Sequence, residues 1–326
     1  MFGVSSFSVE RGNFMKPIYT TISTAGMSRE DWLRLRKTGI GGSDAGAVCG
    51  LNPYSSPMKV YLDKTADTSE DTDNESMRQG RDLEEYVARR FAEETGLSVR
   101  RSLKLYRNRQ YPWMIADVDR LIVGEDAGLE CKTANLFQAD QWKDGAIPLH
   151  YLMQCLHYMA VTGKKAWYLA VVILGKEFQY RKIVREERLI QPLIEIEERF
   201  WKGNVLLRKM PDPDGSEPCE EALGSLYRKA KETERIPLIG FDERLERREE
   251  VIREIEALER EQKKIEQEVK LYLKEHETAA SDRFLVSWSN VDTRRLDTKR
   301  IKEERPEIYE EFSKVTSTRK LSIKAA

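Results

Sequence analysis

Residues 113–133 read WMIADVDRLIVGEDAGLECKT, and this stretch decides the fold that the sequence predicts. Residues 113–123 are apolar apart from three charged side chains, which favours a half-buried strand. The segment GEDAG at 124–128 is typical of a hairpin turn, and residues 128–133 continue as a second strand. We therefore expect two neighbouring strands of one sheet.

The charged side chains of this hairpin are expected on one face. Residues two apart in a strand point the same way, so Glu130 and Lys132 project together while Cys131 points into the core. The hairpin also brings Asp119 of the preceding strand beside them. Two carboxylates can hold one hard cation, and oxygen ligands suit magnesium or manganese better than zinc. With a lysine to orient water or stabilise developing charge, the pattern predicts phosphodiester hydrolysis.

An ordinary surface hairpin is the alternative interpretation of this spacing. In a chain with 34% charged residues such a spacing also arises by chance, with a solvated ion pair in place of a metal site. The apolar surroundings favour the metal site, because charges on a half-buried hairpin are costly unless a metal or mutual pairing compensates them.

Further strands and helices are predicted on both sides of the hairpin. Strands are expected at residues 98–106, 166–174 and 178–184. Helices are expected at residues 28–39, 45–49, 75–95, 150–161 and 188–209, with an acidic loop at 65–74. The order of helix, three strands, helix and two strands predicts an α/β domain with a mixed central sheet flanked by helices.

The composition changes after Pro211, which indicates more than one unit. We expect an N-terminal extension over residues 1–27, the α/β domain over 28–210, a linker over 211–240, and a long helix with a small β appendage over 241–326. The long helix, at 241–277, carries an imperfect apolar stripe: Leu245, Ile252, Ile255, Leu258, Ile265, Val269 and Tyr272. The stripe has gaps in its heptad, so a coiled-coil arm for oligomerisation and packing back on the same chain both stay open. Strands of the appendage are expected at 284–289 and 320–323.

The overall charge gives no argument for nucleic acid, because 55 Lys and Arg face 56 Asp and Glu. A local basic patch lies within residues 99–109, and a solvated basic strand face is its alternative interpretation. Its members are Arg100, Arg101, Lys104, Arg107 and Arg109. The four cysteines form no paired motif, which disfavours structural zinc and iron–sulfur clusters. The longest apolar run, at 166–174, is too short to span a membrane. The N-terminal residues lack an apolar core of signal-peptide length, so a reducing cytoplasm is expected.

Four separated segments resemble those of the YqaJ viral-recombinase family and, more distantly, phage lambda exonuclease, both of the PD-(D/E)xK nuclease superfamily. The segments are Arg36-x-x-Gly39-Ile40-Gly41-Gly42-Ser43-Asp44, Gly80-x-x-Leu83-Glu84, Asp119 with Glu130-x-Lys132, and Gln154-x-x-His157-Tyr158-Met159. They stand in the family's order and cover residues 32–184. The resemblance implies a PD-(D/E)xK nuclease core.

The resemblance also implies roles for individual residues of the catalytic site. Asp119, Glu130 and the carbonyl of Cys131 would be metal ligands, and Lys132 the catalytic lysine. Glu84 would approach the metal or its water, although a solvated helix acid is the alternative. Gln154 would contact the lysine or the nucleophile, and a buried amide needs partners in any case.

A second set of residues resembles the terminal-phosphate site of lambda exonuclease. Arg36 and Ser43 match the positions that hold the phosphate, and the amides of Gly41 and Gly42 would form the facing half of the pocket. A surface arginine and a helix-capping serine are the alternative interpretation.

Three further observations limit the resemblance. Val118 stands where the superfamily name expects proline. Asp117 replaces a small hydroxyl near the phosphate, so a second-metal role is conceivable there. His157 is expected to be a structural polar residue, since no other histidine is near it.

The resemblance implies that the chain would be a magnesium-dependent exonuclease, with manganese as a substitute. It would resect linear double-stranded DNA in the 5′–3′ direction for single-strand-annealing recombination. The resemblance also suggests a RecT-like annealing protein as a partner. It further suggests a homo-oligomer in the form of a ring trimer. A structure-specific endonuclease and a DNA-binding recombination module with weak activity are the alternatives. The clustered cysteines of CRISPR-associated relatives are absent from the sequence.

Overall fold

The computed structural model describes residues 17–66, 74–231 and 236–324. The chain divides into two compact units, and the boundary between them along the sequence falls between Tyr227 and Arg228. Most of the predicted acidic loop, and residues 1–16 of the predicted N-terminal extension, lie outside the described residues. Among the described residues, no helix is long and apolar enough to span a membrane.

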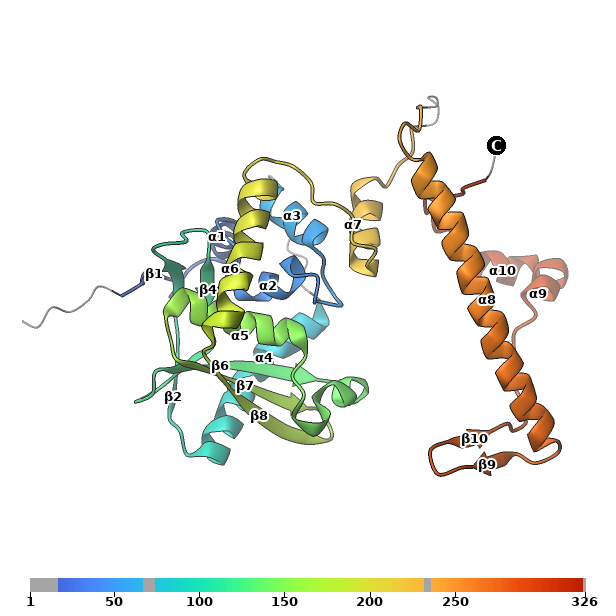
Figure 1. Cartoon of the computed structure of the whole chain (residues 1–326), viewed down its shortest axis with the longest axis horizontal. Coiled ribbons are helices and arrows are strands. Elements are labelled where there is room, and N and C mark those ends of the chain that lie inside the picture. Colours follow the sequence, from blue (N-terminus) through green and yellow to red (C-terminus); the bar gives the residue numbers. More distant parts are fainter. Residues whose placement is uncertain (1–16, 67–73, 232–235, 325–326) are drawn as a thin grey trace, which may run out of the picture. The chain divides into compact units, whose positions relative to one another are not determined.

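The first unit is a mixed α/β structure (Figure 1). Its helices are α1 (Arg29–Lys37), α2 (Gly42–Val48), α3 (Pro57–Thr65), α4 (Glu75–Thr95), the 3-10 helix η1 (Leu136–Gly145), α5 (Leu149–Thr162), α6 (Glu187–Phe200), the π-helix η2 (Trp201–Val205) and α7 (Glu217–Leu226). Its strands are β1 (Tyr19–Ser23), β2 (Val99–Arg101), β3 (Lys104–Asn108), β4 (Ile115–Asp117), β5 (Arg120–Ile122), β6 (Ala127–Ala134), β7 (Ala166–Ile173) and β8 (Glu177–Val184).

The main sheet has the strand order β2-β5-β6-β7-β8. Only the β6–β7 pair is parallel, so the sheet is mixed, as predicted. Strand β7 is buried along its whole length, and its successive side chains face opposite sides of the sheet. Trp167 and Leu169 pack in the cluster that includes α5, while Tyr168 and Ala170 pack with Phe91 of α4. The two helices therefore cover opposite faces of the sheet.

Two predicted strands are each broken in the middle. The strand expected at 98–106 divides into β2 and β3, and the strand expected at 113–123 divides into β4 and β5. One half of each joins the main sheet, and the other half joins a three-stranded sheet of order β1-β3-β4. At the crossing, the amide of Ser102 donates to the carbonyl of Asp119 at 3.3 Å. The unbroken strands were a wrong prediction, because the chain changes sheets beside Asp119.

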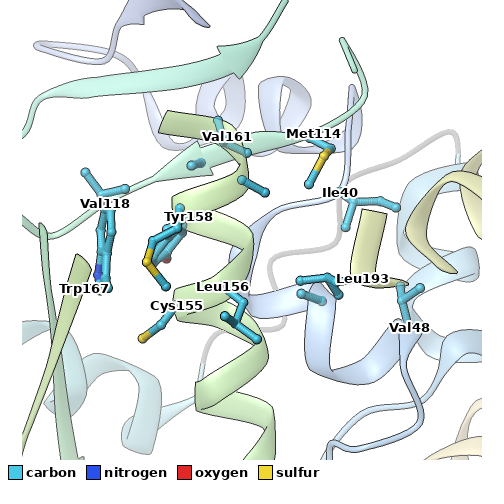
Figure 2. Close-up of a cluster of buried hydrophobic side chains, with 14 of the residues drawn as sticks. Ile40, Val48, Met114, Val118, Cys155, Leu156, Tyr158, Val161, Trp167 and Leu193 are labelled. Carbon is cyan, nitrogen blue, oxygen red and sulfur yellow. The ribbon is translucent and has the colours of Figure 1, made fainter. Parts of the chain in front are cut away.

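Close packing explains the glycines that precede and begin α2. A Cβ on Gly42 would lie 2.4 Å from the ring of Tyr158 on α5, and a Cβ on Gly39 would lie 2.5 Å from the carbonyl of Trp113. Neither distance is tolerable, so these positions need glycine for α2 to reach the core. Figure 2 shows Ile40 and Val48 of this region packed near Leu156 and Leu193.

Several elements of the first unit were not predicted. Strand β1 lies in the predicted N-terminal extension and pairs with β3. Helix α3 begins after Ser56, whose side chain accepts a hydrogen bond from the amide of Lys59. Helix α7 lies in the predicted linker, where Cys219 and Ala222 pack against Met58 of α3.

The second unit contains the predicted long helix as α8 (Asp242–Leu273). It is followed by the hairpin β9 (Thr278–Ala280) and β10 (Leu285–Ser287), and by α9 (Thr298–Glu304) and α10 (Pro306–Phe312). The strand predicted at 320–323 is wrong, since residues 313–324 form no helix or strand. Leu321 is 84% exposed, so this segment has no sheet edge to bury it.

Two truncations should separate the roles of α7 and the second unit. A chain ending after Tyr227 should fold with a melting transition close to that of the full protein. A chain ending after Met210 loses α7 and should be less stable by about 1.5–3 kcal/mol, the usual value for uncovering one buried methionine such as Met58. Thermal denaturation followed by circular dichroism measures both. An unfolded product after Tyr227 would show that the first unit needs the second.

Candidate active site

Strand β6 carries the first two charged residues of the site. Glu130 is only 3% exposed, and Lys132 lies 2.6 Å from its Oε1 atom. Burial opposes a positive charge on Lys132, but Glu130, Tyr151 and Asp119 outweigh it and raise the pKa of the ammonium group. The ammonium also lies 4.8 Å from the centre of the Tyr151 ring. Lys132 is therefore a fixed positive charge beside a buried carboxylate, as the hairpin pattern predicts.

Asp119 lies where the chain crosses between the two sheets. Its Oδ2 atom accepts a hydrogen bond from the amide of Cys131 at 2.8 Å, which fixes the carboxylate against β6. Burial and the neighbouring acids Glu130 and Glu84 raise the pKa of Asp119 well above its ordinary value. Burial also raises the pKa of Glu130, and Lys132 only partly offsets this effect. The structure thus holds two repelling carboxylates in a poorly solvated place.

Helix α5 orients Glu130 from the opposite side. The Nε2 atom of Gln154 donates to Oε1 of Glu130 at 2.6 Å and to the Tyr158 hydroxyl at 2.8 Å. The other oxygen of Glu130, Oε2, is buried and has no hydrogen-bond partner within the described part of the chain. An unpartnered buried carboxylate oxygen costs free energy unless another group binds it. This oxygen is therefore the atom of the site that is available to bind a cation.

Glu84 lies near the two carboxylates but is bound by an arginine. Arg120 of β5 donates to Glu84, to Oε2 of Glu85 at 2.8 Å, and to the carbonyl of Asp119 at 2.8 Å. Glu84 still raises the pKa of both Asp119 and Glu130, so it lies within electrostatic reach of them. Sequence reasoning did not single out Arg120. An arginine next to an acidic residue in an apolar strand was the signal that could have found it.

The donor set fits a hard divalent cation. The described residues contain no group of three or more His, Cys, Asp or Glu side chains placed to enclose a metal ion. Asp119 and the open oxygen of Glu130 supply two carboxylates, and magnesium commonly binds one or two carboxylates and keeps several waters. A cation would also relieve the repulsion that raises the two carboxyl pKa values.

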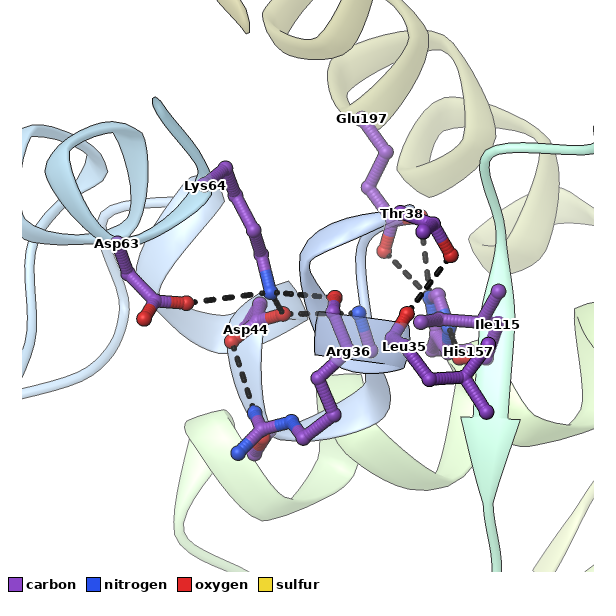
Figure 3. A network of polar contacts seen from close by, with 11 residues as sticks. Leu35, Arg36, Thr38, Asp44, Asp63, Lys64, Ile115, His157 and Glu197 are labelled. Carbon is purple, nitrogen blue, oxygen red and sulfur yellow. Dashed lines mark hydrogen bonds and ion pairs between the residues drawn. The ribbon is translucent and has the colours of Figure 1, made fainter. Parts of the chain in front are cut away.

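Arg36 and Ser43 are brought together, as the predicted phosphate pocket requires. The Nη2 atom of Arg36 donates to the Ser43 hydroxyl at 2.9 Å and lies 3.4 Å from Oδ1 of Asp44. Figure 3 shows how Lys64 holds Asp44 from the other side, with a separation of 2.7 Å. Burial alone raises the pKa of Asp44, but Lys64 and Arg36 lower it overall. The negative charge of Asp44 is therefore compensated inside the protein.

The amide of Gly41 has a different neighbour from the one expected. The amide of Gly41 donates to Oδ2 of Asp44 at 2.8 Å, so its hydrogen is already engaged. Gly42 begins α2 and lies against the Tyr158 ring. In the structure, the side chains of Arg36 and Ser43 are the groups that face each other.

Trp32 is a further residue that sequence reasoning missed. The guanidinium groups of Arg29 and Arg36 lie 4.6 and 5.1 Å from its ring centre. Its indole nitrogen donates to Oδ2 of Asp117 at 2.9 Å. Burial raises the pKa of Asp117, and the bond from Trp32 partly offsets this effect. Trp32 thus links Arg36 to the strand that leads to Asp119.

His157 has the structural role expected of it. It is fully buried, with Nδ1 2.8 Å from Oε1 of Glu197 and Nε2 2.9 Å from the carbonyl of Ile115 (Figure 3). The contact fastens α5 and α6 to β4.

Part of the predicted basic patch also has structural partners. Arg107 donates to the carbonyl of Pro112 at 2.6 Å and to the hydroxyl of Thr38 at 2.6 Å. Arg109 donates to the carbonyl of Pro17 at 2.9 Å. These two arginines hold neighbouring segments together, whereas Arg100 and Arg101 are exposed on β2.

Comparison with known proteins identifies the family. A family model described as a YqaJ-like viral recombinase domain matches residues 31–165. The chain is 36% identical over 303 residues to "Uncharacterized protein YqaJ" of Bacillus subtilis (strain 168), covering 91% of this chain and 95% of that protein. The chain belongs to the YqaJ family, which confirms the resemblance of the four segments.

Solved structures with a similar arrangement include two exonucleases. The crystal structure of an alkaline exonuclease from Laribacter hongkongensis is 20% identical, with 61% of this chain and 96% of that chain covered and a TM-score of 0.46. The same enzyme in complex with dAMP gives a TM-score of 0.47 at the same identity and coverage. A phage related exonuclease from Haemophilus somnus 129PT is 12% identical, with 55% and 100% covered and a TM-score of 0.39.

Asp119→Asn should stabilise the metal-free protein. The raised pKa of Asp119 means that folding disfavours its charge, while an asparagine oxygen can still accept the bond from Cys131. We expect the melting temperature in chelator to rise by about 2–4 °C, the usual equivalent of about 1 kcal/mol in a unit of this size. Added magnesium should stabilise the wild type more than the variant.

The control is Asp126→Asn, a partly exposed acid in the turn of the same hairpin, which should change neither quantity. A lower melting temperature for Asp119→Asn in chelator would contradict the repulsion between the carboxylates.

Proposed function

We propose that this chain is a magnesium-dependent deoxyribonuclease that hydrolyses phosphodiester bonds. The observation that carries the proposal is the buried Oε2 atom of Glu130, which has no hydrogen-bond partner among the described residues. It lies in a β-hairpin site with Asp119 and Lys132. Two carboxylates and a lysine are a suitable set for metal-assisted phosphodiester hydrolysis. Membership of a family described by its viral recombinase domain supports DNA as the substrate.

The protein residues have separate tasks in this proposal. Asp119, Glu130 and the Cys131 carbonyl would hold magnesium, or manganese in its place, which supplies a Lewis acid and a water of lowered pKa. Gln154 keeps Glu130 in a single orientation, and Arg120 does the same for Glu84. Lys132 keeps its positive charge next to the reacting phosphate and stabilises the charge that develops there.

We further propose that the enzyme acts on the ends of linear double-stranded DNA. Arg36 offers a planar fork of donors, and Ser43 faces it, which suits a terminal phosphate. Resection in the 5′–3′ direction for single-strand-annealing recombination belongs to this proposal. So do a RecT-like annealing partner and assembly into a ring trimer.

The catalytic lysine provides a direct test. Lys132→Ala should lower the rate of DNA cleavage by at least about 100-fold while the protein stays folded, because the loss falls on transition-state stabilisation. The measurement uses end-labelled linear duplex and closed circular duplex, each with magnesium and with chelator. Lys143→Ala, at an exposed lysine of η1, is the control and should cleave normally. Undiminished magnesium-dependent cleavage by folded Lys132→Ala would refute the proposed site. Equal cleavage of the circular duplex would favour an endonuclease.

The phosphate pocket is tested separately. Arg36→Ala should slow degradation of 5′-phosphorylated ends by about tenfold or more, and affect 5′-hydroxyl ends much less, since only the former carry the dianion. Arg34→Ala is the matched control, because Arg34 lies on the same helix but is solvated and paired with Glu30. Equal loss on both kinds of end, or no loss on either, would show that the phosphate binds elsewhere.

A further inference from the structure

The apolar stripe of helix α8 fits a heptad repeat when it is counted from Val251 instead of Ile252, with Gln262 as its one interruption. Apolar residues follow one another at alternating spacings of four and three, with one glutamine in the middle: Val251, Ile255, Leu258, Gln262, Ile265, Val269 and Tyr272. Such a 3.5-residue repeat keeps one face of a helix toward a partner helix over several turns. A single polar residue within the face is a feature that fixes register and pairing.

The second unit leaves this face largely uncovered. Ile255, Leu258 and Ile265 are 49%, 66% and 54% exposed, and Leu273 is the only residue of α8 that is buried. An exposed apolar stripe of this length on a long helix is unfavourable in water and indicates an interaction surface. Within the described part of the second unit, residues 236–324, packing of the chain back on this helix does not cover the face.

The charges that border the face have one sign. In the heptad frame, the flanking positions next to the apolar face hold five glutamates: Glu254, Glu259, Glu261, Glu266 and Glu268. The positions farther from the face hold the basic residues Arg253, Arg260, Lys263, Lys264 and Lys270. Charges at the flanking positions set partner choice and orientation in coiled coils.

This charge arrangement disfavours pairing of α8 with a second copy of itself. In a parallel pair Glu254 would face Glu259, and Glu261 would face Glu266. An antiparallel pair would also place glutamates against glutamates. Like charges at these contacts repel, whereas lysine or arginine on a different helix would attract them.

The local contacts of these glutamates do not block such a partner. Arg247 lies 3.0 Å from Glu254, Lys264 lies 3.9 Å from Glu268, and Gln262 donates to Glu266 at 2.9 Å. All three contacts are on the exposed surface, where ion pairs contribute little. They can therefore be exchanged for contacts across an interface.

We propose that α8 is a coiled-coil docking surface for a helix of another protein, with apolar residues in its heptad face and Lys or Arg at its flanking positions. The apolar face supplies burial, and the row of glutamates selects the partner and excludes a second copy of this chain. The inference does not depend on the nuclease activity, since it rests on the second unit alone.

Two synthetic peptides test the proposal on the full-length protein. Both contain about four heptads with Ile and Leu in the apolar positions. One carries Lys at every flanking position and the other carries Glu. Fluorescence anisotropy of labelled peptide measures the Kd. We expect the Lys peptide to bind and the Glu peptide to bind at least about tenfold more weakly.

Variants of the chain assign the binding to the predicted face. Ile255→Asp should abolish binding of the Lys peptide. Leu271→Asp is the matched control, since Leu271 is 75% exposed on the same helix but lies outside the face, and it should bind normally. Changing Glu259, Glu261 and Glu266 together to Lys should reverse the preference between the peptides. Circular dichroism verifies that each variant keeps its helix.

Four outcomes would overturn the proposal. Equal binding of the two peptides, or no binding of either, would show that the glutamates do not select the partner. Normal binding by Ile255→Asp would place the contact elsewhere. A wild-type oligomer in light scattering that Ile255→Asp dissociates and Leu271→Asp does not would make a second copy the occupant of this face.

Discussion

The first unit is organised around the confinement of two like charges. Asp119 and Glu130 lie in a poorly solvated place where each raises the energy of the other's ionised form. The surrounding structure compensates with fixed donors, namely the amide of Cys131, the ammonium of Lys132 and the amide of Gln154. These donors come from β6 and α5. The relative position of that strand and helix therefore offsets the free-energy cost of burying the two carboxylates.

The change of sheet beside Asp119 serves the same arrangement. Were residues 113–123 one regular strand, Asp119 would follow the alternation of its neighbours. The interruption frees its carboxylate to turn toward β6, and the bond from Ser102 closes the gap in the ladder. Arg120, the next residue, then reaches Glu84 and the carbonyl of Asp119. A local departure from regular structure thus assembles charged groups from β5, β6 and α4.

Local patterns in the sequence predicted the parts of the fold that depend on local order. Alternation in the hairpin placed Glu130 and Lys132 together, and the buried run of β7 was recognisable from its apolar residues. The break at Asp119 was not predictable in this way, since it depends on pairing with a segment distant in sequence. The same reason applies to the binding partners of Arg120 and Trp32, which are 36 and 85 residues away along the chain. Helix α7 was missed because what buries it is α3, far from it along the chain.

Gly42 joins two parts of the protein that are chemically separate. The ring of Tyr158 occupies the space where a side chain at this position would lie, and the hydroxyl of the same tyrosine accepts from Gln154, which holds Glu130. Any residue larger than glycine at position 42 would push the tyrosine, and the displacement would reach the carboxylate through two hydrogen-bonded neighbours. The glycine turn beside Arg36 and the two acidic residues are therefore structurally coupled. A change in the backbone of the turn would also move the carboxylate of Glu130.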